Sequence, residues 1–235
     1  LTMSKPELKA ILFDLDGVLV DTSELHANAW AEMARKEGVE PPADIKDQVR
    51  GISRMESLKI ALGDAMANYT DEQLTALATW KNERYLDMVK HLAPADLLPG
   101  VLELFADMEA NGVKIVLGSA SKNAPLVLGY VDIVDRFDAI ADGTCYTRGK
   151  PHPDVFWTGA KMINAAFNEC IVVEDAQAGI KAALDGGFVA VGMGDSVAET
   201  DAHLLINDLR DVTVASLREL HAKFADQVAP CVAVD

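Results

Sequence analysis

Short apolar runs alternate with amphipathic stretches along most of this chain. The first run, at residues 9–15, predicts a strand buried on both faces, because strands of a parallel sheet read as nearly continuous apolar segments. Further strands are predicted at 113–118, 137–141, 170–173 and 188–192. Apolar residues at helical spacing predict helices at 101–111, 124–134, 154–167, 176–185 and 214–224. Strands that alternate with helices indicate an α/β fold with a Rossmann-like parallel sheet.

A block without strand patterns interrupts this alternation. Helices are predicted at 22–37, 53–62 and 70–91, and Ser53 with Glu56 forms a capping-box signature at the start of the second. Thr70 is the expected N-cap of the third. Pro94 and Pro99 mark the return to the alternating pattern. We therefore expect a catalytic core domain at 1–21 and 92–235, and a helical cap domain at 22–91.

Composition and charge narrow the class of protein. Among 235 residues, half are hydrophobic and the formal net charge is −16, so binding to nucleic acid or to an anionic membrane is not expected. Residues 1–9 are too polar and too short for a signal peptide, and no apolar run is long enough to span a membrane. The three cysteines have no paired spacing, which fits a reducing cytoplasm. We expect a cytoplasmic protein that acts as a monomer.

Polar side chains follow the predicted strands at the end where ligands bind in such sheets. Asp14 and Asp16 follow the first strand, on the same side because strand side chains alternate. Ser119 follows the second, Lys150 lies in a later loop, and the pair of acids at 174–175 follows the strand at 170–173. Taken singly, Ser119 suits a turn cap, Lys150 a solvated charge, and the acids a helix N-terminus. Their joint arrangement favours a site for phosphoryl chemistry.

The acids Asp14, Glu174 and Asp175 would repel one another unless a cation lay between them. Mg²⁺ is the expected ion, because it takes oxygen ligands and the cluster has no His or Cys. Lys150 and the Ser119 hydroxyl can hold the oxygens of a phosphoryl group. Hydrolysis of a phosphate monoester needs acceleration up to ~10²¹-fold, and an acid–base group supplies about 10²–10⁴. Positioning and charge neutralisation must therefore supply most of the rest.

These motifs, in this order, resemble those of the haloacid dehalogenase superfamily of aspartate-nucleophile phosphotransferases. The resemblance covers nearly the whole chain, and the helical insert is similar to the α-helical cap of that superfamily. It implies that Asp14 is a nucleophile that becomes an aspartyl phosphate, and that Asp16 is a general acid/base. It also implies that Mg²⁺ is held by Asp14, the Asp16 carbonyl and Asp175, with Glu174 nearby, while Ser119 and Lys150 hold the transferring phosphate.

Within the superfamily, the segments at 13–22, 50–54, 81–82, 119–123 and 174–179 resemble those of the β-phosphoglucomutases. That resemblance implies interconversion of β-D-glucose 1-phosphate and β-D-glucose 6-phosphate through β-glucose 1,6-bisphosphate. A mutase of this kind needs a second phosphate site, and the planar fork of Arg54 suits one. The implied substrate-binding residues are Thr22, His26, Trp30, Gly51, Ile52, Arg54, Lys81, Ala120, Ser121, Lys122 and Asn123.

The chain departs from the β-phosphoglucomutase pattern at a few positions. Arg50 stands where Lys is common, Met55 where an acid is common, and Arg148-Gly149 precedes Lys150 where smaller or uncharged residues are expected. No catalytic group is lost. Two alternatives stay open, namely a Mg²⁺-dependent phosphatase of a small phosphorylated metabolite and a non-catalytic sugar-phosphate binder. Against the phosphatase stands the second set of cations, Arg54 with Lys81 and Lys122. Against the binder stands the complete set of motifs.

Overall fold

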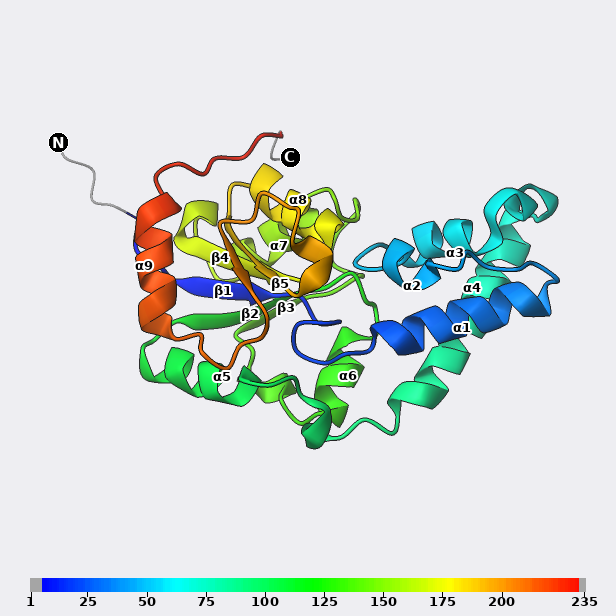
Figure 1. The fold of residues 1–235 in the computed structure, drawn as a ribbon, viewed down its shortest axis with the longest axis horizontal. Coiled ribbons are helices and arrows are strands. Elements are labelled where there is room, and N and C mark those ends of the chain that lie inside the picture. Colours follow the sequence, from blue (N-terminus) through cyan, green and yellow to red (C-terminus); the bar gives the residue numbers. More distant parts are fainter. Residues whose placement is uncertain (1–5, 233–235) are drawn as a thin grey trace.

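A computed structural model describes residues 6–232 of the chain, so residues 1–5 of the polar N-terminal stretch lie outside it. Six parallel strands form one sheet in the order β3-β2-β1-β4-β5-β6 (Figure 1). This confirms the predicted α/β fold. The strands are β1 (Ala10–Phe13), β2 (Lys114–Gly118), β3 (Ala139–Ala141), β4 (Cys170–Glu174), β5 (Val189–Met193) and β6 (Leu204–Ile206).

Helices cover both faces of the sheet, which explains why its strands are apolar except at a few end positions such as Lys114 and Glu174. Side chains alternate along β1: Ile11 and Phe13 pack into one apolar cluster, and Ala10 and Leu12 into another. The first cluster holds residues of α5 (Val101–Ala110), α6 (Ala124–Tyr130) and α9 (Val214–Phe224). The second holds residues of α7 (Asp154–Met162) and α8 (Gln177–Asp185). Because both faces are buried, the carboxyl ends of the strands are the part of the sheet that can hold a ligand.

Two core helices are shorter than the pattern predicts. We expected a helix at 124–134, but α6 ends at Tyr130, and Asp132 adopts a left-handed conformation with φ of 59°. We expected a helix at 154–167, but α7 ends at Met162, and Asn164 has φ of 55°. Asp and Asn tolerate this backbone region better than most residues, so each terminates its helix there. The short elements β6 and α2 (Ile45–Gln48) were not predicted.

Residues 22–91 form a helical part beside the sheet (Figure 1). It contains α1 (Ser23–Lys36), α2, α3 (Arg54–Leu62) and α4 (Asp71–Val89). Ser53 and Glu56 form the predicted capping box, and Thr70 caps α4 with Gln73. These helices have an apolar cluster of their own, formed by residues such as Trp30, Met33, Leu58, Leu62 and Leu74. Ala29 of α1 and Tyr85 and Val89 of α4 belong instead to the cluster that contains Ile11 and Phe13 of the sheet, so the helical part has a core of its own and also packs with the sheet.

Two chain segments join the helical part to the sheet, and they lie side by side. Val20 and Leu97 form an isolated antiparallel bridge, and the Leu98 N–H donates to the Leu19 carbonyl at 2.9 Å.

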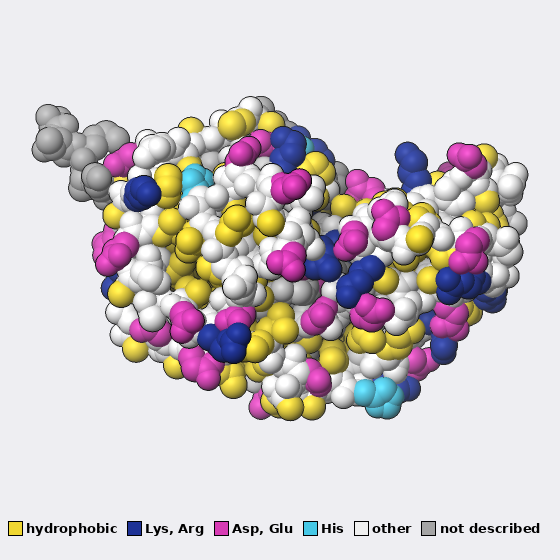
Figure 2. Space-filling view, viewed as in Figure 1, with side chains coloured by type: hydrophobic (Ala, Val, Ile, Leu, Met, Phe, Trp, Pro, Cys, Tyr) yellow, Lys and Arg dark blue, Asp and Glu magenta, His cyan; other side chains and the backbone are white. Residues whose placement is uncertain are grey.

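On the outer surface, acidic side chains are scattered over both parts in the face drawn in Figure 2. In the part of the chain that the structure describes, no helix is both long and apolar enough to cross a membrane.

Candidate active site

Asp14 and Asp16 stand directly beyond the end of β1, as predicted. The Asp14 N–H donates to the Val173 carbonyl at 3.0 Å, which extends the pairing of β1 with β4 by one residue. Gly17 follows with φ of 86°, and its N–H donates to the Val20 carbonyl at 2.8 Å. This left-handed turn favours glycine. Asp14 is buried, Asp16 is half-buried, and both line the same cavity between the sheet and the helical part.

Lys150 reaches the acids through the protein interior and is fully buried. Its Nζ donates to Asp14 Oδ1 at 2.7 Å and to the Gly118 carbonyl at 3.1 Å, and it also pairs with Glu174. Burial alone would lower the pKa of Lys150, but the carboxylates of Asp14 and Glu174 hold it above its ordinary value. Lys150 is therefore a fixed positive charge beside the candidate nucleophile.

Oxygen atoms of Asp14, Glu174 and Asp175 lie within 4.8 Å of one another, and all three residues are buried. Burial, with the nearby charge of Asp14, raises the pKa of Glu174 to about 8 and that of Asp175 to about 7. Asp175 Oδ1 is buried and has no hydrogen-bond partner among the described residues. Carboxylate oxygens of this kind fit a hard divalent cation such as Mg²⁺, which would satisfy Asp175 Oδ1 and lower the repulsion.

Groups from the helical part and the linker contact Asp16. The Thr22 hydroxyl donates to Asp16 Oδ1, and His26 Nε2 lies 3.7 Å from the same oxygen. Burial, reinforced by the charge of Asp14, raises the pKa of Asp16 to about 8. Asp16 therefore retains a proton near neutral pH, which a general acid requires.

His26 and Lys81 form a buried pair next to Asp16. Lys81 Nζ lies 2.9 Å from His26 Nδ1 and faces the rings of Trp30 and Tyr85, 4.6 and 4.9 Å from their centroids. Burial, together with Arg54, lowers the pKa of Lys81 to about 7. Burial also lowers the pKa of His26, with Lys81 and Arg54 adding to the effect. The pair and the Trp30 ring give this side of the cavity both polar and aromatic character.

A second cluster of polar side chains links α3, α4 and the loop after β2. Arg54 Nη2 donates to Asn82 Oδ1 at 2.9 Å, and Asn123 Nδ2 donates to the same oxygen at 2.8 Å. Within the loop, the Ser121 N–H donates to Ser119 Oγ at 3.1 Å, and the Asn123 N–H donates to Ser121 Oγ at 3.2 Å. These bonds collect several donors around one region of the cavity, as an anion site requires.

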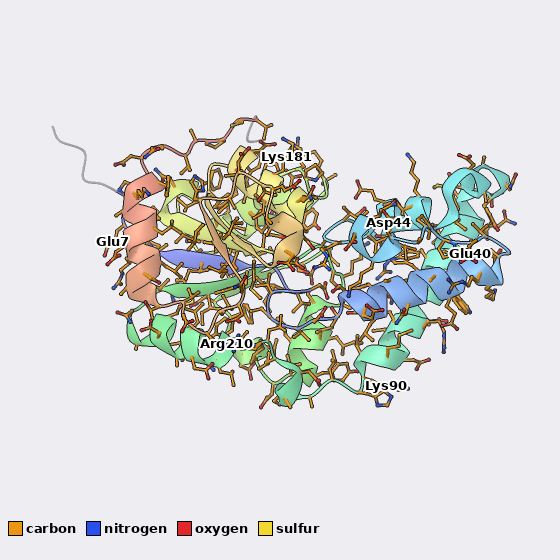
Figure 3. All side chains as sticks on the ribbon, viewed as in Figure 1. Glu7, Glu40, Asp44, Lys90, Lys181 and Arg210 are labelled. Carbon is orange, nitrogen blue, oxygen red and sulfur yellow. The ribbon has the colours of Figure 1, made fainter. Side chains whose placement is uncertain are left out.

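The structure brings most of the sequence-predicted residues to one cavity. Its lining includes Asp14, Asp16, His26, Trp30, Gly51, Ile52, Arg54, Lys81, Ala120, Ser121, Lys122 and Asn123. The other five predicted residues do not line it: Thr22 bonds Asp16, Ser119 bonds its own loop, Lys150 bonds Asp14 and Glu174, and Asp175 bonds Arg50. By contrast, charged side chains labelled in Figure 3, such as Glu40 and Lys90, lie on the outer surface of the helical part.

Two contacts of the site were not predicted. Arg50 bonds Asp175 from the helical part, and Asn82 links Arg54 to Asn123. Both residues lie in segments that resemble those of the β-phosphoglucomutases, at 50–54 and 81–82. The resemblance indicated these segments but did not predict which residues Arg50 and Asn82 would contact. The cavity is also lined by Ser23, Lys46, Val49 and Ser57. No periodicity or motif in the sequence singles these four out.

Comparisons with known proteins agree with this geometry. The model of the haloacid dehalogenase-like hydrolase family matches residues 8–187. The β-phosphoglucomutase of Bacillus subtilis is 39% identical over 214 residues, which cover 90% of this chain and 95% of that protein. A crystal structure of β-phosphoglucomutase from Clostridium difficile has a TM-score of 0.89 and 35% identity, covering 94% of this chain and 100% of that one.

Relatives with another activity also match. Hexitol phosphatase A of Escherichia coli is 26% identical over 215 residues, covering 88% of this chain and 94% of that protein. The family model, the full-length matches and the sheet with its cluster of acids agree. The chain therefore belongs to the haloacid dehalogenase-like hydrolase family.

Proposed function

We propose that this protein is a Mg²⁺-dependent sugar phosphomutase that interconverts β-D-glucose 1-phosphate and β-D-glucose 6-phosphate. One observation carries the proposal: a single cavity is lined both by Asp14 and Asp16 and by the donors Arg54 and Asn123. A bisphosphate intermediate needs one phosphate at the nucleophile and the other held elsewhere. Arg54 suits the second phosphate, because its fork can donate two parallel hydrogen bonds to phosphate oxygens.

In the proposed reaction, an Asp14 oxygen attacks one phosphorus of β-glucose 1,6-bisphosphate, and the bond between that phosphorus and the sugar oxygen breaks. Asp16 gives its proton to the departing sugar oxygen. Transfer of the C1 phosphate in this way yields glucose 6-phosphate, which leaves. β-Glucose 1-phosphate then binds with its 6-hydroxyl at the aspartyl phosphate, and this hydroxyl attacks the phosphorus while the bond to Asp14 breaks and Asp16 takes up the proton. The bisphosphate that forms turns round before its C1 phosphate is transferred to Asp14. Lys150 and Ser119 hold the transferring oxygens, which suits a reaction that depends on positioning and charge.

The residues that would hold Mg²⁺ are Asp14, the Asp16 carbonyl and Asp175, with Glu174 adjacent. When bound, the ion supplies charge neutralisation between the nucleophile and the phosphoryl oxygens. The fit is supported by the convergence of the three carboxylates within 4.8 Å and by the unpartnered Asp175 Oδ1. Lys150 cannot serve this purpose alone, because among the described residues its Nζ bonds Asp14, Glu174 and the Gly118 carbonyl but not Asp175.

Residues 22–91 are proposed to act as a cap over the core at 1–21 and 92–235. The paired linkers at Val20 and Leu97 provide a place for the cap to swing without disturbing the sheet. Closure would exclude water, which favours transfer to a sugar hydroxyl over hydrolysis. Lys81 and His26 would be carried to the sugar by the same motion, since both belong to cap helices.

A phosphatase is the second candidate, and the similarity to hexitol phosphatase A is the observation that favours it. In that case water would replace the sugar hydroxyl as acceptor, and Asp16 could activate it. The two candidates differ in whether phosphate leaves the sugar altogether.

Phosphorus NMR separates the two candidates. The enzyme is mixed with β-glucose 1-phosphate, Mg²⁺ and a trace of β-glucose 1,6-bisphosphate. A mutase converts the substrate signal into that of glucose 6-phosphate, with little free phosphate. Free phosphate that appears as fast as the sugar product would refute the mutase. Tight binding without any conversion would indicate a non-catalytic binder.

A further inference from the structure

Arg50 forms a partly buried ionic link between the helical part and the sheet. It follows α2, and its Nη1 donates to Asp175 Oδ2, although 125 residues separate the two. The side chains are only 17% and 4% exposed. Arg50 Nε is buried without a hydrogen-bond partner among the described residues, so the pairing with Asp175 is the polar contact that holds this guanidinium.

The two oxygens of Asp175 have different surroundings. Oδ2 is bound by Arg50, whereas Oδ1 is buried and unpartnered. Gly17 lies directly against this carboxylate, since a Cβ at this position would collide with Oδ2. This division leaves one oxygen free for an ion while the other fixes the direction of the carboxylate, as partners of metal ligands usually do.

The backbone beside Arg50 is fitted to the backbone beside Asp175. Gly51 has φ of 72°, and a Cβ there would lie 2.7 Å from the Cβ of Ala176. A larger residue would push the α2–α3 loop away from the loop after β4. The close approach therefore places Arg50 at Asp175 when the helical part lies against the sheet, and withdraws it when the two separate.

Charge balance also depends on Arg50. Lys150 bonds Asp14 and Glu174, so the cation that directly contacts Asp175 is Arg50. An ionised carboxylate buried without a partner is costly. Closing the cap therefore brings a cation to a carboxylate that Lys150 does not contact.

We infer that Arg50 is a positioning residue, delivered by the cap, that orients the ion-binding carboxylate of Asp175 and so couples cap closure to Mg²⁺ binding. Because such coupling is reciprocal, a ligand that closes the cap must tighten Mg²⁺, and Mg²⁺ must favour closure. The inference rests on the proposed function in taking glucose 6-phosphate as the closing ligand.

Isothermal titration calorimetry of Mg²⁺, with and without saturating glucose 6-phosphate, measures this coupling. No bisphosphate is added, so the sugar phosphate binds without turnover. In the wild type, glucose 6-phosphate should tighten Mg²⁺ at least about fivefold. In Arg50→Gln the tightening should be lost, and Mg²⁺ affinity with the sugar phosphate present should fall about tenfold or more. Without the sugar phosphate, Arg50→Gln should weaken Mg²⁺ binding much less than it does with the sugar phosphate, because the ion alone closes the cap only in part.

Arg84→Gln is the matched control, because Arg84 pairs with Glu32 and both belong to the helical part. It should behave as the wild type, and Arg50→Lys should restore part of the coupling. Coupling that persists in Arg50→Gln overturns the inference. So does an equal change of Mg²⁺ affinity with and without the sugar phosphate, or the absence of coupling in the wild type that binds both ligands.

If glucose 6-phosphate does not bind the wild type, the proposed function fails, and closure is then read by small-angle X-ray scattering with Mg²⁺ alone. The wild type and Arg84→Gln should be more compact than Arg50→Gln. Equal radii of gyration would overturn the inference independently of the sugar.

Discussion

Replacing Lys150 by Met tests the electrostatic account of the core. Met keeps an apolar stem of similar length in a fully buried position but removes the charge that pairs with Asp14 and Glu174. Breaking a buried ion pair from one side costs about 3–5 kcal/mol, because the remaining charge has no partner. Loss of one charged group on the transferring phosphate should also lower kcat by about 10²–10³ or more.

A second substitution separates these two effects. In the double variant Lys150→Met/Glu174→Gln, one of the two carboxylates abandoned by Lys150 can no longer ionise. Part of the lost stability should therefore return, while activity should not, because no cation holds the phosphoryl oxygens. The free energy of unfolding is measured by urea denaturation in EDTA above pH 8, where Glu174 of the wild type is ionised, and kcat by formation of glucose 6-phosphate.

Two results would refute this reasoning. If the free energy of unfolding of Lys150→Met lies within about 1 kcal/mol of the wild-type value, the buried ion pair contributes little to stability. Activity that returns with stability in the double variant would show that Lys150 acts on the fold and not on the phosphate. Addition of Mg²⁺ should stabilise Lys150→Met, since the ion binds the folded protein and offsets the unpaired acids.

Four further predictions concern the acids and the cap arginine. Asp14→Asn should take up no phosphoryl group from β-glucose 1,6-bisphosphate in intact-mass spectrometry; normal turnover would contradict its role as nucleophile. Asp16→Ala should slow phosphoryl transfer about 10²–10⁴-fold while changing Mg²⁺ affinity far less, as rapid-quench kinetics and calorimetry would show. Arg54→Ala should weaken bisphosphate binding about 10–100-fold but spare slow hydrolysis of the phosphoenzyme, and equal losses would mark it as structural. Burial raises the pKa of Glu174 to about 8, so in EDTA the folded wild type retains a proton that the unfolded chain has lost, and its stability falls between about pH 5 and pH 8. As the pH rises over that range, the Tm of the wild type should fall relative to that of Glu174→Gln. A difference in Tm that does not change with pH would show that the pKa of Glu174 is not raised.

Features that depend on neighbours in the sequence were predictable. The strand before Asp14, the capping box at Ser53, the N-cap at Thr70 and the helix over 214–224 all follow from local patterns, and the structure confirms them. Asp132 and Asn164, which end α6 and α7, are residue types that favour a left-handed helix end. The apolar spacing continued past them, and the predicted helices were therefore too long. Strand β6 has three residues, two of them exposed, so no buried apolar run marked it.

Partners across the cavity could not be predicted in the same way. A parallel sheet brings strand ends together, so Asp14, Lys150 and Glu174 could be expected to meet. The contacts of Arg50 with Asp175 and of Asn82 with Asn123 depend instead on how the helical part rests on the sheet. No periodicity encodes that placement, because it follows from the linkers and from close approaches such as that at Gly51.

The bridge between Val20 and Leu97 has a consequence for how such proteins can be modified. The chain leaves and re-enters the sheet at neighbouring points, so an exchange of everything between them alters no strand register. The residues that face the sugar could thus be exchanged as a module, but the incoming segment must supply the contacts that Thr22 and His26 make with Asp16 and that Arg50 makes with Asp175. Chimeras joined at these two points are a direct route to new specificities on the same scaffold.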